Sequence, residues 1–184
     1  MQGFDGTRAL LIPVEKVDDH WGDLEKAEAI IFGSPTYMGS ASAEFKKFMD
    51  ATSKIWYAQG WKDKIAAGFT NSASQNGDKA STLYQLVTFA MQMGMIWAGV
   101  GDLPGNNWSG GARSDLNRLG SWVGAMGQSN ADEKEPSLGD VDTAARLGER
   151  VAMIARRFKE GVPYQTERLS EPEFRAQNVA RRRA

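Results

Sequence analysis

Hydrophobic and polar residues follow two different patterns along this chain. Short apolar runs at residues 8–14, 29–32, 64–70 and 95–100 end at glycine, proline or polar residues, which is typical of buried strands. Between them lie stretches whose apolar residues recur every three or four positions, as in helices with one buried face. This alternation of strand and helix predicts an α/β fold in which helices cover both faces of a parallel sheet.

Residues 29–52 form the clearest strand–loop–helix unit. A loop is expected at residues 33–39, where two glycines would let the backbone approach a flat ligand closely. Ser40 or Ser42 can cap the helix that follows, whose core face carries Phe45, Phe48 and Met49. Ligands of open α/β sheets bind at loops of this kind, where a strand's carboxyl end leads into a helix.

Two further helices are predicted around this unit. Asp18 or Asp19 would cap a short helix through Trp21, Leu24 and Ala27, before the strand at residue 29. The helix that opens at Ser81 and ends before Gly94 has an apolar face made of Leu83, Leu86, Val87, Ala90 and Met91.

The second half of the chain is less regular. A long loop with seven glycines is expected from Gly101 to about Asn130, followed by a helix that starts near Pro136 and Ser137. The expected core face of that helix consists of Val141, Ala144, Ala145, Gly148, Val151, Ala152, Ala155 and Phe158. Residues 1–160 would form one domain, and residues 161–184 a solvated or partly helical tail rather than an arm for an anionic partner.

Composition excludes several functional classes. The 184 residues carry a formal charge of −1, which argues against a nucleic acid as the main partner. There is no cysteine, so disulfides, thiolate nucleophiles and cysteine-ligated metals are excluded. No apolar run approaches the roughly 18 residues that a membrane span needs. We therefore expect a cytoplasmic protein without a membrane or nucleic-acid partner.

The side chains offer little chemistry of their own. The single histidine, His20, stands before a helix, where a surface or capping role is expected, and the acidic residues are scattered rather than paired. We therefore predict neither a catalytic acid–base residue nor a metal site. Two polar loops, at residues 33–39 and 71–78, supply backbone amides and hydroxyl groups. This set of groups suits a bound cofactor that performs the chemistry itself, and a flavin is a natural candidate.

Four motifs occur in an order that resembles a known family. They are the run from Ser34 to Gly39 (Ser-Pro-Thr-Tyr-Met-Gly), the run from Thr70 to Gly77 (Thr-Asn-Ser-Ala-Ser-Gln-Asn-Gly), the helix from Thr82 that ends at Met93-Gly-Met95, and Pro136-Ser137. Together they resemble the flavodoxin-like WrbA family of NAD(P)H:quinone oxidoreductases over residues 8–158. The resemblance implies a flavodoxin-like three-layer α/β/α sandwich, FMN and NAD(P)H as cofactors, a quinone-type electron acceptor and a homo-oligomer, either a dimer or a tetramer.

The resemblance also assigns flavin contacts by position. They would come from the first loop (Pro35, Thr36, Tyr37, Met38 and Gly39), from the second (Thr70, Asn71, Ser72, Ala73 and Gly77) and from Met93. Met93 stands where well-studied members have a histidine, and Tyr37 and Met38 replace an arginine and a phenylalanine. Residues 124–128 follow a large glycine-rich loop in the family and would close over the site.

One expected part of the family pattern is missing from this sequence. Members begin with a strand, a loop that binds the FMN phosphate and a helix, whereas this sequence begins after that helix. Either the copy is N-terminally incomplete or the sheet is rearranged, and we expect an incomplete copy. Two alternatives stay open: an electron-transfer carrier without hydride chemistry, and a flavin-free oligomeric interaction module. In such a module the interface anchors would be Trp56, Tyr57, Trp61, Trp97, Trp108 and Trp122.

Overall fold

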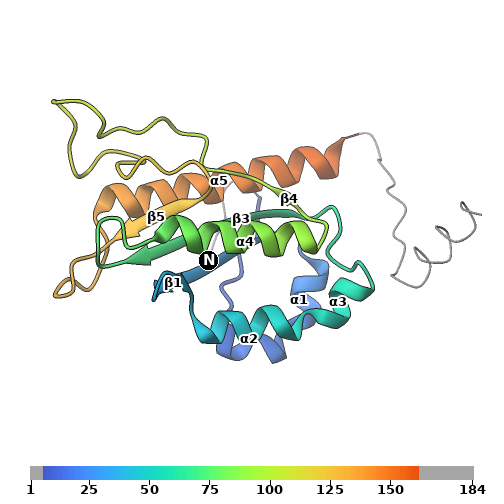
Figure 1. Ribbon diagram of the computed structural model, residues 1–184. Helices are drawn as coiled ribbons and strands as arrows, with labels where there is room; N and C mark the ends of the chain where they lie inside the picture. The colour runs from blue at the N-terminus through green and yellow to red at the C-terminus, as the bar shows by residue number, and fades with distance from the viewer. Residues whose placement is uncertain (1–5, 162–184) are drawn as a thin grey trace, which may run out of the picture.

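The computed structural model describes residues 6–161. Its strands are β1 (Ala29–Tyr37), β2 (Ser40–Ala41), β3 (Ile65–Ser72), β4 (Ile96–Trp97) and β5 (Ala125–Gln128). Its helices are the 3-10 helix η1 (Val14–Asp19) and the α-helices α1 (Trp21–Lys26), α2 (Ala43–Ala51), α3 (Ser53–Tyr57), α4 (Lys79–Gln92) and α5 (Leu138–Glu160). Figure 1 shows α4 and α5 on opposite sides of the sheet, as the predicted α/β sandwich requires.

β3 is the central strand of the sheet. β1 pairs with one of its edges in parallel, from Ala29 opposite Ile65 to Pro35 opposite Asn71. On the other edge, β4 pairs with the start of β3 and β5 pairs with its end, both in parallel. β4 and β5 thus share one position in the sheet, and the intervening residues 98–124 leave it as a long excursion (Figure 1).

Two hydrophobic cores lie on the two faces of the sheet. Alternate residues of β3 separate them: Ala66 packs toward α4, whereas Ile65 and Ala67 pack toward α5. The first core is aromatic and contains Phe32, Phe45, Phe48, Trp61 and Phe89. The second consists of Ile65 and three alanines, Ala67, Ala98 and Ala125, and is closed by Leu147 and Val151 of α5.

The predicted strand at residues 8–14 is wrong. Arg8 forms an isolated β-bridge, and the segment then continues without regular structure to η1. Leu10 and Leu11 are exposed, and Pro13 has no N–H to donate to a ladder. The Asp18 or Asp19 cap is also wrong, because His20 holds the N-cap position of α1.

The loop predicted at residues 33–39 is wrong in its extent. β1 continues to Tyr37, and Met38 and Gly39 form a two-residue turn into β2. Both turn residues have positive φ, 50° and 74°, which matches the twist of a tight hairpin. The long loop predicted up to Asn130 is likewise wrong, because residues 125–128 form β5 inside the sheet instead of closing over a site.

The core faces of two helices differ from their predicted positions. In α4, Met91 is exposed, and Phe89 and Met93 take its place in the core. In α5, Val141 and Phe158 are exposed, and the buried face is formed by Gly139, Asp140, Thr143, Leu147 and Val151. Polar residues of α5 are buried because loops supply their hydrogen-bond partners, which a hydropathy pattern does not reveal.

Other predicted elements are confirmed. The Ser42 side chain accepts a hydrogen bond from the Phe45 N–H and caps α2. Gly94, at φ 73°, ends α4, and Ser137 holds the N-cap position of α5. Within residues 6–161, no helix is both long enough and apolar enough to cross a bilayer. The predicted tail lies outside the described residues, apart from Gly161.

Candidate functional site

Three segments meet at the carboxyl ends of the parallel strands. Pro35 of β1 lies opposite Asn71 of β3, which lies opposite Gly127 of β5. The β1–β2 turn, the loop 73–78 and the loop 129–137 therefore leave the same edge of the sheet. This edge is where open α/β sheets bind ligands.

The hairpin presents an apolar tip. Tyr37 is 64% exposed and Met38 is fully exposed, while Met38 adopts a left-handed conformation that is uncommon for a non-glycine residue. The Gln85 side-chain oxygen accepts hydrogen bonds from Ser40 Oγ and Ala41 N, both at 3.1 Å, which ties β2 to α4. The turn is thus fixed on α4 while its aromatic side chain stays available for a flat partner.

Beneath the hairpin, three hydroxyl groups form a buried chain. Thr36 Oγ1 donates to Thr82 Oγ1 at 2.8 Å and lies 2.7 Å from Thr70 Oγ1. All three threonines are buried. The side chains of Thr36 and Thr70 therefore join β1, β3 and α4 below the site and do not face a ligand.

The loop after β3 is held from beneath by a buried lysine. Lys79 is 1% exposed, and its Nζ donates to Ser72 Oγ at 2.8 Å, to the Ser74 carbonyl at 2.7 Å and to the Gln75 carbonyl at 3.0 Å. Burial lowers the pKa of Lys79, an effect that Asp140 offsets and Arg118 reinforces.

Gly77 is required by the shape of this loop. Its φ is 54°, and a Cβ there would lie 2.2 Å from Ser72 Oγ. Among the described residues, the backbone N–H groups of Gln75, Asn76 and Gly77 make no hydrogen bond within the protein. The loop therefore offers three consecutive donors to solvent or to a ligand.

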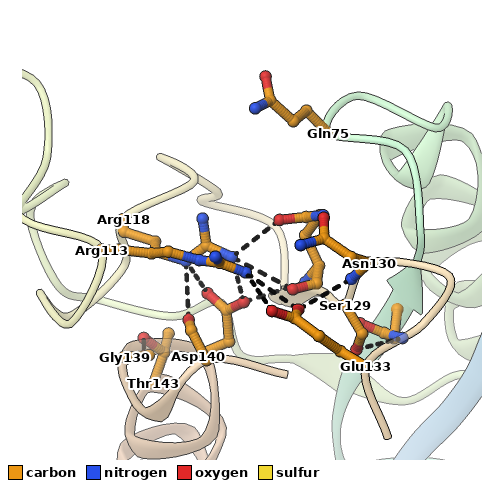
Figure 2. Close-up of polar contacts among 12 residues, drawn as sticks. Gln75, Arg113, Arg118, Ser129, Asn130, Glu133, Gly139, Asp140 and Thr143 are labelled. Carbon is orange, nitrogen blue, oxygen red and sulfur yellow. Dashed lines mark hydrogen bonds and ion pairs between the residues drawn. The ribbon is translucent and has the colours of Figure 1, made fainter. Parts of the chain in front are cut away.

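A buried ion pair supports the neighbouring loop. The Asp140 carboxylate accepts from Arg118 at 2.7 and 2.8 Å and from the Gln128 backbone N–H at 3.0 Å. The side chains of Arg118 and Asp140 are 8% and 2% exposed. Figure 2 shows the pair inside a wider polar network, with Gln75 standing apart from it on the loop above.

Gln128 and Asn71 join the loops to one another. Gln128 Nε2 donates to the Ala73 carbonyl and to Asn130 Oδ1, both at 3.0 Å, and Asn71 Nδ2 donates to Ser129 Oγ at 3.3 Å. The second and third segments of the site therefore form one hydrogen-bonded unit.

An open cavity of about 620 Å³ lies beside the third segment, in front of the start of α5. Its lining includes Arg113 and Lys134 but also Glu133 and Glu135, so its formal charges balance. A hydrogen bond from the Asn130 N–H and the nearby Arg113 guanidinium lower the pKa of Glu133. The cavity therefore does not select anions by its net charge.

Not every predicted site residue lies at this edge. Pro35, Tyr37, Met38 and Gly39 come together there with Asn71, Ser72, Ala73 and Gly77. Met93 lies at the far end of α4, a helix about 21 Å long by its 14 residues, where Thr52 Oγ1 donates to its sulfur at 3.8 Å. The structure does not bring Met93 to the other predicted contacts.

Sequence reasoning missed the residues that support the loops. Lys79 follows an Asn-Gly-Asp turn, a position that usually places a lysine in solvent, so its burial was not visible in the sequence. Arg118 and Gln128 fall in the segment expected to be a loop. Trp61, considered as an interface anchor, is a core residue at 1% exposure, whereas Trp108 and Trp122 are exposed. Within residues 6–161, no cluster of three potential metal ligands occurs.

Comparisons with known proteins agree with this architecture. A family model described as NADPH-dependent FMN reductase matches residues 14–108. A solved structure described as the flavodoxin, WrbA-like protein from Agrobacterium tumefaciens superimposes with a TM-score of 0.61 and 44% identity, covering 76% of this chain and 73% of that chain.

Curated relatives carry two kinds of name. Flavodoxin FldP of Pseudomonas aeruginosa is 42% identical over 84% of this chain and 86% of its own length. An NAD(P)H dehydrogenase (quinone) of Geobacter sulfurreducens is 37% identical over 80% of this chain and 69% of its own length. The fold and these matches define a flavodoxin-like protein. The chain belongs to the WrbA-type group of the NADPH-dependent FMN reductase family, which confirms the resemblance seen in its sequence.

Proposed function

We propose that this protein binds FMN at the shared edge of β1, β3 and β5, and passes electrons from NAD(P)H to a quinone-type acceptor. The observation that carries the proposal is the set of free N–H groups at Gln75, Asn76 and Gly77 beside the exposed Tyr37. A flavin ring has acceptor atoms along its edge and a flat face, and these two features of the site match it.

The residues fit such a cofactor in distinct ways. Tyr37 would stack on or border the ring, and the turn at Met38 and Gly39 would bring backbone close to it. The N–H groups of the loop 75–77 would donate to the ring edge. FMN, when bound, supplies the electron transfer, while the protein holds and orients it and needs no acid–base residue of its own.

A test uses the glycine that the loop requires. FMN is titrated with the purified chain while flavin fluorescence is followed, and Gly77→Ala is expected to weaken binding at least about tenfold. A Cβ at residue 77 would collide with Ser72 and strain the loop conformation. Gly148→Ala is the matched control, because a Cβ at residue 148 meets nothing within 4 Å. If the wild-type chain does not bind FMN, the proposal is wrong.

An electron-transfer carrier is the second candidate, favoured by the name flavodoxin of a 42% identical relative. Both candidates predict FMN binding, but only the oxidoreductase oxidises NAD(P)H. Following the 340 nm absorbance of NADH and of NADPH, with and without a quinone, therefore separates them. FMN binding without loss of that absorbance would support the carrier.

We also propose that the protein forms a homo-oligomer through α4. Tyr84 and Met91 are 60% and 46% exposed, although both are large apolar residues. They stand seven residues apart and therefore share one face of the helix. Among the described residues, no helix or strand lies in front of α4 in Figure 1, on the side of the helix turned away from the sheet. Such a face is typical of an interface between copies of a chain.

A further inference from the structure

We propose that Lys79 is a positioning residue that turns the loop 74–77 outward and makes the flavin site electropositive. This inference rests on the proposed FMN site. A lysine at the start of a helix is usually exposed to solvent. Lys79 is instead only 1% exposed and lies beneath the loop. It is the one buried cation of the described residues that contacts the loop backbone.

The carbonyl groups of the loop point inward, toward Lys79. Lys79 Nζ accepts no hydrogen bond and donates to the carbonyls of Ser74 and Gln75, while its backbone N–H donates to the Asn76 carbonyl at 3.2 Å. Three consecutive carbonyl groups thus point inward to a single residue.

The N–H groups of the same peptide units point outward. In a trans peptide unit, the N–H points opposite to the C=O. The units whose carbonyls belong to residues 74, 75 and 76 carry the N–H groups of Gln75, Asn76 and Gly77. These N–H groups must face away from Lys79, and like their neighbours at Ala73, Ser74 and Asp78 they have no partner within the described residues. The hydrogen bonds that Lys79 donates therefore fix the outward direction of these N–H groups.

The buried charged groups beneath the loop do not cancel one another. Lys79 interacts with Arg118 and Asp140, so this buried cluster contains two cations and one carboxylate. Its formal charge is therefore +1 when Lys79 is protonated, the form that can donate all three of the observed hydrogen bonds. The outward N–H dipoles and the positive charge beneath them both attract the acceptor-rich edge of the flavin ring. The attraction is stronger when that edge gains negative charge.

The consequence is a preference for reduced over oxidised FMN. Removing the ammonium should weaken that preference at least tenfold, which corresponds to a reduction potential about 30 mV more negative for a two-electron couple. Lys79 would act on FMN through the loop and through its charge, without touching it.

The test compares two lysine-to-methionine substitutions. Lys79→Met removes the ammonium beneath the loop. Lys64→Met is the matched control, because Lys64 also donates to two backbone carbonyls, those of Glu25 and Ala27, but at the amino end of β3. For each purified variant, FMN affinity, the reduction potential of bound FMN and the unfolding transition are measured.

The expected result is a more negative potential and weaker FMN binding in Lys79→Met only. If both variants lose stability while the potential of each stays at the wild-type value, Lys79 is a structural residue and the inference is overturned. If the wild-type chain itself binds no FMN, the proposed function fails first and this inference fails with it.

A second measurement does not depend on the folding of Lys79→Met. In the wild-type protein, ¹⁵N–¹H spectra recorded during FMN addition should show the largest shifts at Gln75, Asn76 and Gly77. If FMN moves the signals of residues 37–39 and leaves those of residues 75–77 in place, the site stands but the role given to Lys79 is wrong.

Discussion

At the scale of single residues, Thr36 lies in a strand that leads to the site, but its hydroxyl group contributes to stability in the interior. Thr36→Val keeps the shape and the strand preference but removes the group that links Thr70 and Thr82. We expect a loss of about 1–3 kcal/mol in unfolding free energy, because two buried hydroxyls lose their partner. Urea unfolding measures this loss, and FMN affinity should follow the wild type.

Thr88→Val is the matched control, since that exposed hydroxyl donates only to the Tyr84 carbonyl of its own helix. Equal stability of the two variants would contradict the role of the buried chain. The sequence predicted flavin contacts at Thr36 and Thr70, but it could not show that their side chains turn into the protein. That direction depends on Thr82, which lies 46 residues further along the chain from Thr36.

At the scale of elements, the start of α5 is held by charge rather than by apolar packing. Asp140→Asn would leave the Arg118 guanidinium buried without a counter-charge, and we expect a loss of about 3–5 kcal/mol in unfolding free energy. The control is Asp102→Asn, which weakens the more exposed pair with Arg146 and should cost about 1 kcal/mol or less. The double variant Arg118→Met/Asp140→Leu should lose less than Asp140→Asn. If Asp140→Asn and Asp102→Asn lose similar amounts of unfolding free energy, the buried ion pair is not what holds the start of α5.

The same region explains why β5 could not be predicted. Its four residues include one glycine and no β-branched residue, so they carry no strand pattern. β5 forms because its backbone pairs with the free edge of β3, and because Asp140 accepts a hydrogen bond from the Gln128 N–H. β3 has a continuous apolar run and α4 a repeating apolar face, and both were predicted from local sequence alone.

At the scale of the whole molecule, apolar runs that alternate with amphipathic stretches predicted the α/β architecture, although the first run, at residues 8–14, is not a strand. Each buried run needs neighbours on both faces, and the helices between the runs supply them. The pattern of apolar runs did not predict which of the expected site residues lie close together in the fold. Met93 matched a family position, yet α4 carries it to the opposite end of the sheet from Tyr37 and Gly77.

The exposed face of α4 leads to a prediction about assembly. If copies of the chain associate through Tyr84 and Met91, the variants Tyr84→Glu and Met91→Glu should reduce the mass measured by light scattering after size exclusion to that of one chain, because each buries a charge without a partner. Val141→Glu is the control, since Val141 of α5 is 47% exposed, much like Met91, but lies on the opposite side of the sheet. A wild-type protein that elutes as a single chain at micromolar concentration would refute the interface. An oligomer that only Val141→Glu dissociates would move the interface to α5.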